Sequence, residues 1–222
     1  MIVVGALGVF AKKGFEAASS RELAAAAGVS EALIYKYFPT KEALYQELAG
    51  LLRKDKDQLL AKVTASTPGT AGCVRALHFI GRMMLFGPPG RPADDSVDRL
   101  IGQSLLGDGT FAAAFLENLF YPALPYLADC LQAAWLAGDL EGHEAPSQPQ
   151  CVLFHHFIGS LALFSLPSRS LVPFEDREQL FREALMFGLR GLGLSQAALS
   201  RNTDFSRLYD DYLNITQGEH TS

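Results

Sequence analysis

Residues 20–39 read SRELAAAAGVSEALIYKYFP, and this stretch predicts two short helices joined by a three-residue turn. Ser19 and Glu22 have the spacing of a capping box, in which each side chain binds the backbone N–H of the other residue at a helix start. Gly28 suits the left-handed turn that ends the first helix. Ser30 then caps the second helix.

Pro39 ends the second helix, and Thr40 caps the helix that follows. Two short helices joined by a turn that contains glycine form a helix-turn-helix. The second helix, expected over residues 31–38, is the one that enters the major groove of DNA in such motifs. The apolar residues of the motif are assigned to the protein core and not to DNA: Leu23, Ala24, Val29, Leu33, Ile34 and Phe38.

The residues around this motif closely resemble the DNA-binding domain of TetR/AcrR-type regulators. The resemblance spans residues 10–48 and rests on FAKKGF at 10–15, ELA at 22–24, AGVS at 27–30, IYKYFP at 34–39 and KEAL at 41–44. Many residue types and spacings agree at once, which makes the signal specific. It implies an all-α protein in which an N-terminal three-helix helix-turn-helix domain is joined through a long fourth helix to a C-terminal helical ligand-binding and dimerisation domain.

The resemblance also implies which residues contact DNA: Ser20, Arg21, Glu31, Ala32, Tyr35, Lys36, Tyr37 and Lys41. Tyr35 and Lys36 would reach base edges or phosphate, and the Tyr37 hydroxyl would donate to a phosphate. Lys41 would hold a phosphate with help from a helix N-terminus, and Ser20 and Arg21 would touch the DNA backbone. The alternative for both tyrosines is half-buried packing.

Two features depart from the family. Glu31 favours the helix dipole but repels phosphate, so capping or solvation is preferred over acceptance from a cytosine amino group. Family members usually carry a basic segment ahead of the first helix, whereas this sequence begins inside that helix. Either the natural start lies upstream or the affinity for DNA is reduced.

Composition is compatible with a folded protein that has few basic residues to spare. The 222 residues are 49% hydrophobic and 19% charged, which suffices for a sizeable core. The net charge is −5, but residues 1–56 hold 8 Lys and Arg against 6 Asp and Glu, a net of +2. Three widely spaced cysteines argue against a disulfide framework and favour a cytoplasmic location. We expect neither a signal peptide nor a membrane partner.

Helical periodicity recurs along the whole chain. A first helix ends at Gly14, and a long fourth helix runs to about residue 65. Further helical stretches are expected near 71–87, 96–106, 110–121, 123–137, 149–166 and 175–193, with a short helix over 199–212. The domains are predicted as 1–48 for the helix-turn-helix, 49–213 for ligand binding and dimerisation, and 214–222 as a frayed tail.

Large apolar residues of the second domain are candidates for the wall of a ligand cavity, although ordinary core packing explains any one of them. They are Phe79, Met83, Met84, Phe86, Phe111, Phe115, Phe120, Tyr121 and Trp135. The resemblance implies a dimer interface on the last two long helices, and the candidate residues are Cys151, His155, Gly159, Ala162, Leu185, Gly188, Leu189 and Leu192.

The sequence therefore predicts a ligand-responsive, homodimeric DNA-binding regulator, most simply a repressor that a small hydrophobic or aromatic molecule releases from a palindromic double-stranded operator. No cofactor and no catalytic residue are expected. No metal is expected either, because Cys151 and His155 are too few ligands for a structural zinc site. Two alternatives stay open. The chain is a sensor or carrier that has lost DNA binding, or an enzyme on the helical C-terminal domain that uses His155 or His156.

Overall fold

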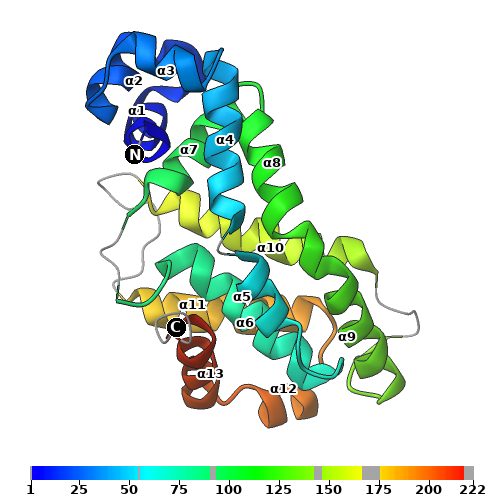
Figure 1. Cartoon of the computed structure of the whole chain (residues 1–222). Helices are drawn as coiled ribbons and strands as arrows, with labels where there is room; N and C mark the ends of the chain where they lie inside the picture. Colours follow the sequence, from blue (N-terminus) through cyan, green and yellow to red (C-terminus); the bar gives the residue numbers. More distant parts are fainter. Residues whose placement is uncertain (1, 55, 91–93, 143–146, 167–175, 218–222) are drawn as a thin grey trace. The chain divides into compact units, whose positions relative to one another are not determined.

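A computed structural model of the chain describes residues 2–54, 56–90, 94–142, 147–166 and 176–217 (Figure 1). Within these ranges every regular element is a helix, apart from one isolated antiparallel bridge between Leu140 and Leu194. This confirms the predicted all-α class. The helices are α1 (Ile2–Ala17), α2 (Ser20–Ala27), α3 (Glu31–Tyr37), α4 (Lys41–Lys54), α5 (Lys56–Val63), α6 (Thr70–Phe86), α7 (Ser96–Leu106), α8 (Thr110–Leu119), η1 (Tyr121–Ala123), α9 (Leu124–Leu136), α10 (Gln148–Phe164), α11 (Arg177–Gly191), α12 (Gln196–Asn202) and α13 (Phe205–Gln217).

The helices pack into two compact units. Unit 1 consists of Met1–Asp57 and Asp94–Pro122, and unit 2 consists of Gln58–Ala93 and Ala123–Ser222. Helices α7 and α8 belong to unit 1, because α7 packs on α1 and α8 packs on α4. The unit that holds the helix-turn-helix is therefore larger than the predicted 1–48 domain, and the functional division predicted from the sequence stays a prediction.

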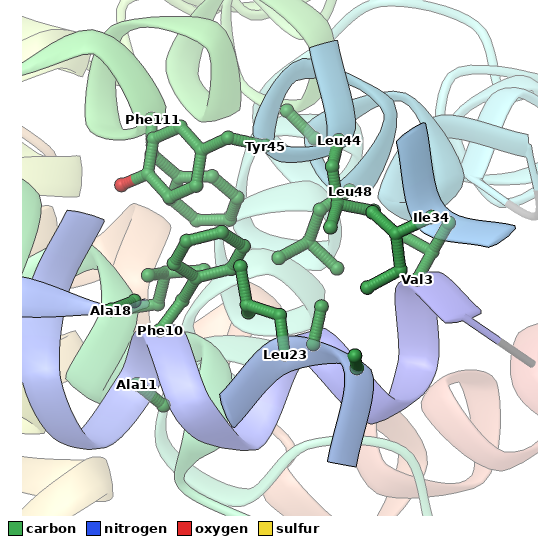
Figure 2. Packing of buried hydrophobic residues seen from close by; sticks show 14 residues of the cluster. Val3, Phe10, Ala11, Ala18, Leu23, Ile34, Leu44, Tyr45, Leu48 and Phe111 are labelled. Atoms are coloured by element: carbon green, nitrogen blue, oxygen red, sulfur yellow. The ribbon is translucent and has the colours of Figure 1, made fainter. Parts of the chain in front are cut away.

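The core of unit 1 forms where α1, α2, α3, α4, α7 and α8 bring their apolar faces together (Figure 2). Phe10 is fully buried and lies edge-on to Tyr45, with their ring centroids 5.0 Å apart. Tyr45 also contacts Phe15 at 4.9 Å and Phe111 at 5.5 Å. Aromatic pairs at these separations add attraction beyond the burial of their area. These rings therefore hold the first helix, the fourth helix and α8 together.

Most predicted helix boundaries agree with the structure, and two differ. Gly14 leaves the helical conformation at φ 74°, as the sequence suggests, but α1 resumes for one further turn. The predicted long fourth helix corresponds to α4 and α5, which lie on either side of residue 55, outside the described residues. The predicted helix over 199–212 is two helices, and the second continues to Gln217, so residues 214–217 are not frayed as expected.

In unit 2, helix α6 lies at the centre, in contact with α9, α10, α11, α12 and α13 (Figure 1). Arg82 of α6 is almost fully buried and pairs with Glu178 of α11 at 2.9 Å. Its guanidinium carbon lies 4.5 Å from the ring centroid of Tyr209 and 5.3 Å from that of Tyr212, both on α13. The charge of Arg82 is thereby compensated, and α13 is held on α6 by cation–π contacts.

The packing of unit 1 predicts a large effect of truncating Phe10. Phe10→Ala removes a fully buried ring from the centre of the aromatic group, so we expect the free energy of unfolding to fall by about 3–5 kcal/mol. Urea unfolding followed by circular dichroism measures this change. Val4→Ala, on the same helix at a side chain that is 68% exposed, serves as the control and should change little. A loss below about 1 kcal/mol for Phe10→Ala would contradict the described core.

Candidate nucleic-acid interface

The start of α2 is fixed by the predicted capping box. The Ser19 backbone N–H donates to Glu22 Oε2 over 3.2 Å, and the Glu22 backbone N–H donates to Ser19 Oγ over 3.3 Å. Lys13 of α1 adds an ion pair to the same carboxylate. The bond from Lys13, followed by those from Ser19, lowers the pKa of Glu22 to about 2. The first turn of α2 is therefore anchored to α1 by a carboxylate that stays ionised.

The turn between α2 and α3 follows the sequence prediction. Gly28 adopts φ 68° and ψ 30°, a left-handed conformation that glycine accepts without strain. Its N–H donates to Ala25 O, and the N–H of Val29 donates to Ala24 O. Ser30 Oγ then accepts from the Leu33 N–H over 3.2 Å and caps α3. Local hydrogen bonds thus set the angle between the two helices.

The inner and outer faces of this helix pair are sharply different. Leu23, Ala24 and Ile34 are buried, as predicted for core residues. The residues proposed to contact DNA lie outside: Glu31, Ala32, Tyr35, Lys36, Tyr37 and Arg21 are exposed, and Ser20 is half-buried. Tyr37 is 64% exposed, which argues against the packing alternative for this residue, whereas Tyr35 is 45% exposed, so half-buried packing stays open for Tyr35.

One side-chain hydrogen bond joins the outer faces of the two helices. The hydroxyl groups of Ser20, at the start of α2, and Tyr35, on α3, are hydrogen-bonded to each other. This bond therefore holds the Tyr35 ring across the start of α2, where Ser20 directly precedes Arg21 in the chain. Lys36 likewise follows Tyr35, and the two cations, Arg21 and Lys36, are both exposed.

Lys41 does not have the geometry expected of a free phosphate ligand. Its Nζ donates to the carbonyl oxygens of Phe15 at 2.8 Å, Ala18 at 3.3 Å and Glu16 at 3.4 Å. The ammonium also lies 4.3 Å from the centroid of the Phe15 ring. Because a lysine ammonium has three N–H donors, these carbonyls occupy all of them. In this structure Lys41 binds the end of α1.

Comparisons with known proteins agree with this geometry. Residues 2–48 match the family model described as bacterial regulatory proteins, tetR family. The chain has a TetR-family helix-turn-helix domain. A comparison with curated proteins gives no match. Helices α1, α2 and α3 of the TetR-family domain, with the start of α4, account for the whole matched range.

Solved structures extend the similarity of fold beyond the TetR-family domain. A regulatory protein of the tetR family from Rhodococcus RHA1 has a TM-score of 0.61 at 18% identity, covering 88% of this chain and 96% of that chain. A transcriptional regulator from Rhodococcus sp. has a TM-score of 0.54 at 24% identity, covering 86% and 95%. RolR, solved in complex with resorcinol, has a TM-score of 0.52 at 16% identity and covers 91% of both chains. The C-terminal helices thus share the fold of TetR-family proteins.

The residues predicted to line a ligand cavity do not gather at one place. Phe111 is fully buried in the core of unit 1 against Tyr45, so it packs the TetR-family domain and is withdrawn as a ligand residue. Phe115 and Phe120 also lie in unit 1, as does Tyr121, whose ring is next to that of Phe120. Phe79, Met83, Met84, Phe86 and Trp135 lie in unit 2 on α6 and α9.

The predicted dimer residues mostly face the inside of unit 2, which corrects the sequence prediction. Buried residues among them are Cys151, His155, Ala162, Leu185, Leu189 and Leu192. Gly159 faces Met84, whose Cε lies 3.2 Å from the position of an added Cβ. At Gly188 an added Cβ would lie 2.3 Å from the Phe154 ring, so this glycine allows α10 and α11 to approach each other. The stripe chosen from the sequence is the core-facing one.

A different apolar face of α10 and α11 is open to solvent. Leu153 is 69% exposed, Phe164 is 54% exposed and Phe187 is 66% exposed. The rings of Phe157 and Phe187 contact each other, with centroids 5.2 Å apart. A hollow lies on this face between the two helices and is lined by Gln150, Leu153, Phe154, Phe157, Phe187, Gly188, Gly191 and Leu192. We name this surface the α10–α11 face.

Three nitrogen-bearing side chains of α6, of which two are buried and one, Arg75, is half-buried, were not singled out from the sequence. These side chains, at helical spacing, are those of Arg75, His78 and Arg82. In the described part of the chain, the Nε atoms of the two arginines and the Nε2 atom of His78 have no hydrogen-bond partner. Burial, followed by the charges of Arg82 and Arg182, lowers the pKa of His78 to about 3, so the imidazole is neutral at pH 7. The signal was present in the sequence as basic residues within an otherwise apolar helix.

Cysteine and histidine side chains of unit 2 are placed for packing. Cys73, Cys130 and Cys151 are free thiols buried on α6, α9 and α10. Burial raises the pKa of the Cys151 thiol to about 11 and that of Cys73 well above its usual value. Burial, followed by the neighbouring His156, lowers the pKa of His155 to about 4. In the ranges that the structure describes, no three His, Cys, Asp or Glu residues are grouped to hold a metal ion.

The capping box predicts a specific pH dependence. The folded-state pKa of Glu22 is about 2, below the usual 4.5, so its contribution to stability is present above pH 4.5 and is lost as the pH falls towards 2. Glu22→Gln keeps a side-chain acceptor but removes the charge that binds Lys13. We expect the thermal stability of the wild type to exceed that of Glu22→Gln above pH 4.5 and the two to converge near pH 2. A difference that is independent of pH would contradict the ion pair.

Proposed function

We propose that the protein is a non-enzymatic, sequence-specific DNA-binding transcription regulator that acts as a homodimer on a palindromic operator. One observation carries the proposal. The exposed polar surface of the helix-turn-helix, formed by Ser20, Arg21, Tyr35 and Lys36, lies on a domain that matches the TetR family over residues 2–48. In a helix-turn-helix the second helix enters the major groove, and the N-terminus of a helix attracts phosphate.

The roles of the individual residues follow from their exposure. Arg21, in the first turn of α2, is positioned to bind a backbone phosphate, and such contacts set orientation without reading sequence. Lys36 and Ala32 on α3 are free to meet base edges, where lysine favours guanine and a methyl group favours thymine. Tyr37 offers its hydroxyl to a phosphate. Glu31 lies in the first turn of α3, where it favours the helix dipole.

The α10–α11 face supports dimerisation. An exposed apolar patch is a common mark of a protein–protein contact, and a patch that binds its own copy produces a closed twofold dimer. Leu153, Phe157 and Phe187 supply the apolar side chains, and the hollow beside Phe187 receives those of the second subunit. Two recognition helices would then meet half-sites about 34 Å apart, one turn of DNA.

We further propose that a small aromatic molecule binds in unit 2 and releases the DNA, which makes the protein a repressor. Phe79, Met83, Met84, Phe86 and Trp135 offer apolar contacts in this unit. The partnerless nitrogen atoms of α6 offer hydrogen bonds to a hydroxyl or another acceptor on the ring. RolR, which shares the fold, was solved with the phenolic ligand resorcinol. Reduced, buried cysteines are consistent with action in the cytoplasm.

DNA selection tests the regulator proposal. Wild-type protein is incubated with a library of random-sequence duplexes, and bound DNA is sequenced over several rounds. We expect the wild type to enrich a palindrome. A double variant that carries both Arg21→Ala and Lys36→Ala should not enrich it, because both exposed cations of the surface are removed. Arg207→Ala, an exposed arginine on α13, is the matched control and should enrich the same palindrome.

Salt dependence provides the second measurement. On the selected duplex, log K should fall linearly with log salt concentration, with a slope of about −0.9 for each phosphate contacted. Failure of the wild type to enrich any sequence would sink the regulator proposal and favour a sensor that does not bind DNA.

The dimer proposal predicts the effect of a charge on the α10–α11 face. Phe187→Asp places a carboxylate in the centre of the apolar surface, so we expect the protein to become monomeric and to lose its affinity for the palindrome. Sedimentation velocity measures the mass. Leu106→Asp, at an α7 side chain that is 89% exposed, is the control and should remain dimeric. A dimer that survives Phe187→Asp would place the interface elsewhere.

A further inference from the structure

The end of α1 leaves backbone carbonyl groups without helical partners. Gly14 has φ 74° and ψ 175°, which interrupts the helix just before its last turn. The carbonyl groups of the last residues of a helix lack intrahelical donors, and they carry the negative end of the helix dipole. Phe15, Glu16 and Ala18 are at this position, where the chain leaves α1 and turns towards Ser19.

A single ammonium group satisfies this end. Lys41 Nζ lies 2.8 Å from Phe15 O, 3.3 Å from Ala18 O and 3.4 Å from Glu16 O. The same group lies over the Phe15 ring, which packs on Tyr45 four residues after Lys41. A cation near a helix C-terminus and above an aromatic face is favoured twice by electrostatics. The first residue of α4 is thereby tied to the last turn of α1.

The residues that follow this junction are those of the proposed DNA surface. Ala18 is followed directly by the capping residue Ser19, and then by Ser20 and Arg21 in the first turn of α2. Ser20 in turn holds the Tyr35 hydroxyl on α3. The position of Ala18 therefore sets where the first turn of α2, which carries Arg21, begins. Through Ser20 it also sets the direction in which the Tyr35 side chain points.

We propose that Lys41 is a positioning residue of the helix-turn-helix. It binds the carbonyl groups at the end of α1 and so places Arg21 and Tyr35 for DNA, and it does not act as a phosphate ligand. This inference rests on the proposed DNA-binding function, since it assigns how one residue serves that function. The competing role is the direct phosphate contact that the family resemblance implies for Lys41.

Lys41→Arg separates the two roles. Arginine is an effective phosphate ligand, so it should preserve the affinity if Lys41 binds phosphate. No nitrogen of a guanidinium group carries three hydrogens, so arginine cannot direct three bonds from one atom to the three carbonyl groups. We therefore expect Lys41→Arg to weaken binding of the selected palindrome about tenfold, as Lys41→Met does. An affinity equal to that of the wild type would overturn the proposal.

A double-variant comparison gives a readout that a merely structural role leaves unchanged. If Lys41 acts through Arg21, then Lys41→Met should weaken binding in the wild type but add little in Arg21→Ala, and it should leave the salt slope of Arg21→Ala unchanged. A phosphate ligand would instead reduce that slope by about 0.9 per contact, or about 1.8 for a dimer.

Folding is followed in parallel by circular dichroism and thermal unfolding, and Lys41→Arg is the variant to use if Lys41→Met does not fold. Variants that are less stable yet bind the palindrome with unchanged affinity and salt slope would reduce Lys41 to a purely structural residue and overturn the proposal. A wild type that selects no palindrome would instead contradict the proposed function itself, so the two failures are distinguishable.

Discussion

Phe10 of α1 is buried against α4, and this is the contact on which the proposed DNA surface depends. Helices α2 and α3 are short, and only Leu23, Ala24 and Ile34 of the pair are fully buried. Helices of this length are marginal on their own and take their stability from tertiary packing. The aromatic group of Phe10, Phe15, Tyr45 and Phe111 supplies that packing and makes a rigid support from α1, α4 and α8.

Polar contacts then orient what the aromatic group supports. Lys13 binds Glu22 at the start of α2, Lys41 binds the end of α1, and Ser20 binds Tyr35. Each of these bonds joins one helix to another close to the surface that faces away from the core. The two lysines thus serve the architecture of the helix pair, while Arg21 and Lys36 keep their charges exposed for a partner.

The parts of this site that the sequence predicted are those set by local spacing. The capping and turn hydrogen bonds join backbone or side-chain groups that are only a few residues apart in the chain. The residues that make them, Ser19, Glu22, Gly28 and Ser30, have their expected roles in the structure. The role of Lys41 depends on carbonyl groups 23 to 26 residues away in the chain, which no local pattern reveals.

Faces and neighbours of the later helices were harder to predict for a related reason. Helix α11 carries apolar residues on two faces, and the stripe of Leu185 and Leu189, which the sequence suggests for a dimer interface, is buried inside unit 2. Phe187 lies between them in the chain and points outwards. Phe111 was placed in a ligand cavity because a helical period does not tell which of two units a helix joins.

The reactivity of the three buried thiols reports local opening of unit 2. Cys73, Cys130 and Cys151 lie on three different helices, and burial raises the pKa of each thiol. A thiol that is neutral and covered reacts slowly with an alkylating reagent, so modification requires a local opening. The order in which the three are labelled over time therefore reports which of α6, α9 and α10 separates first, without any introduced probe.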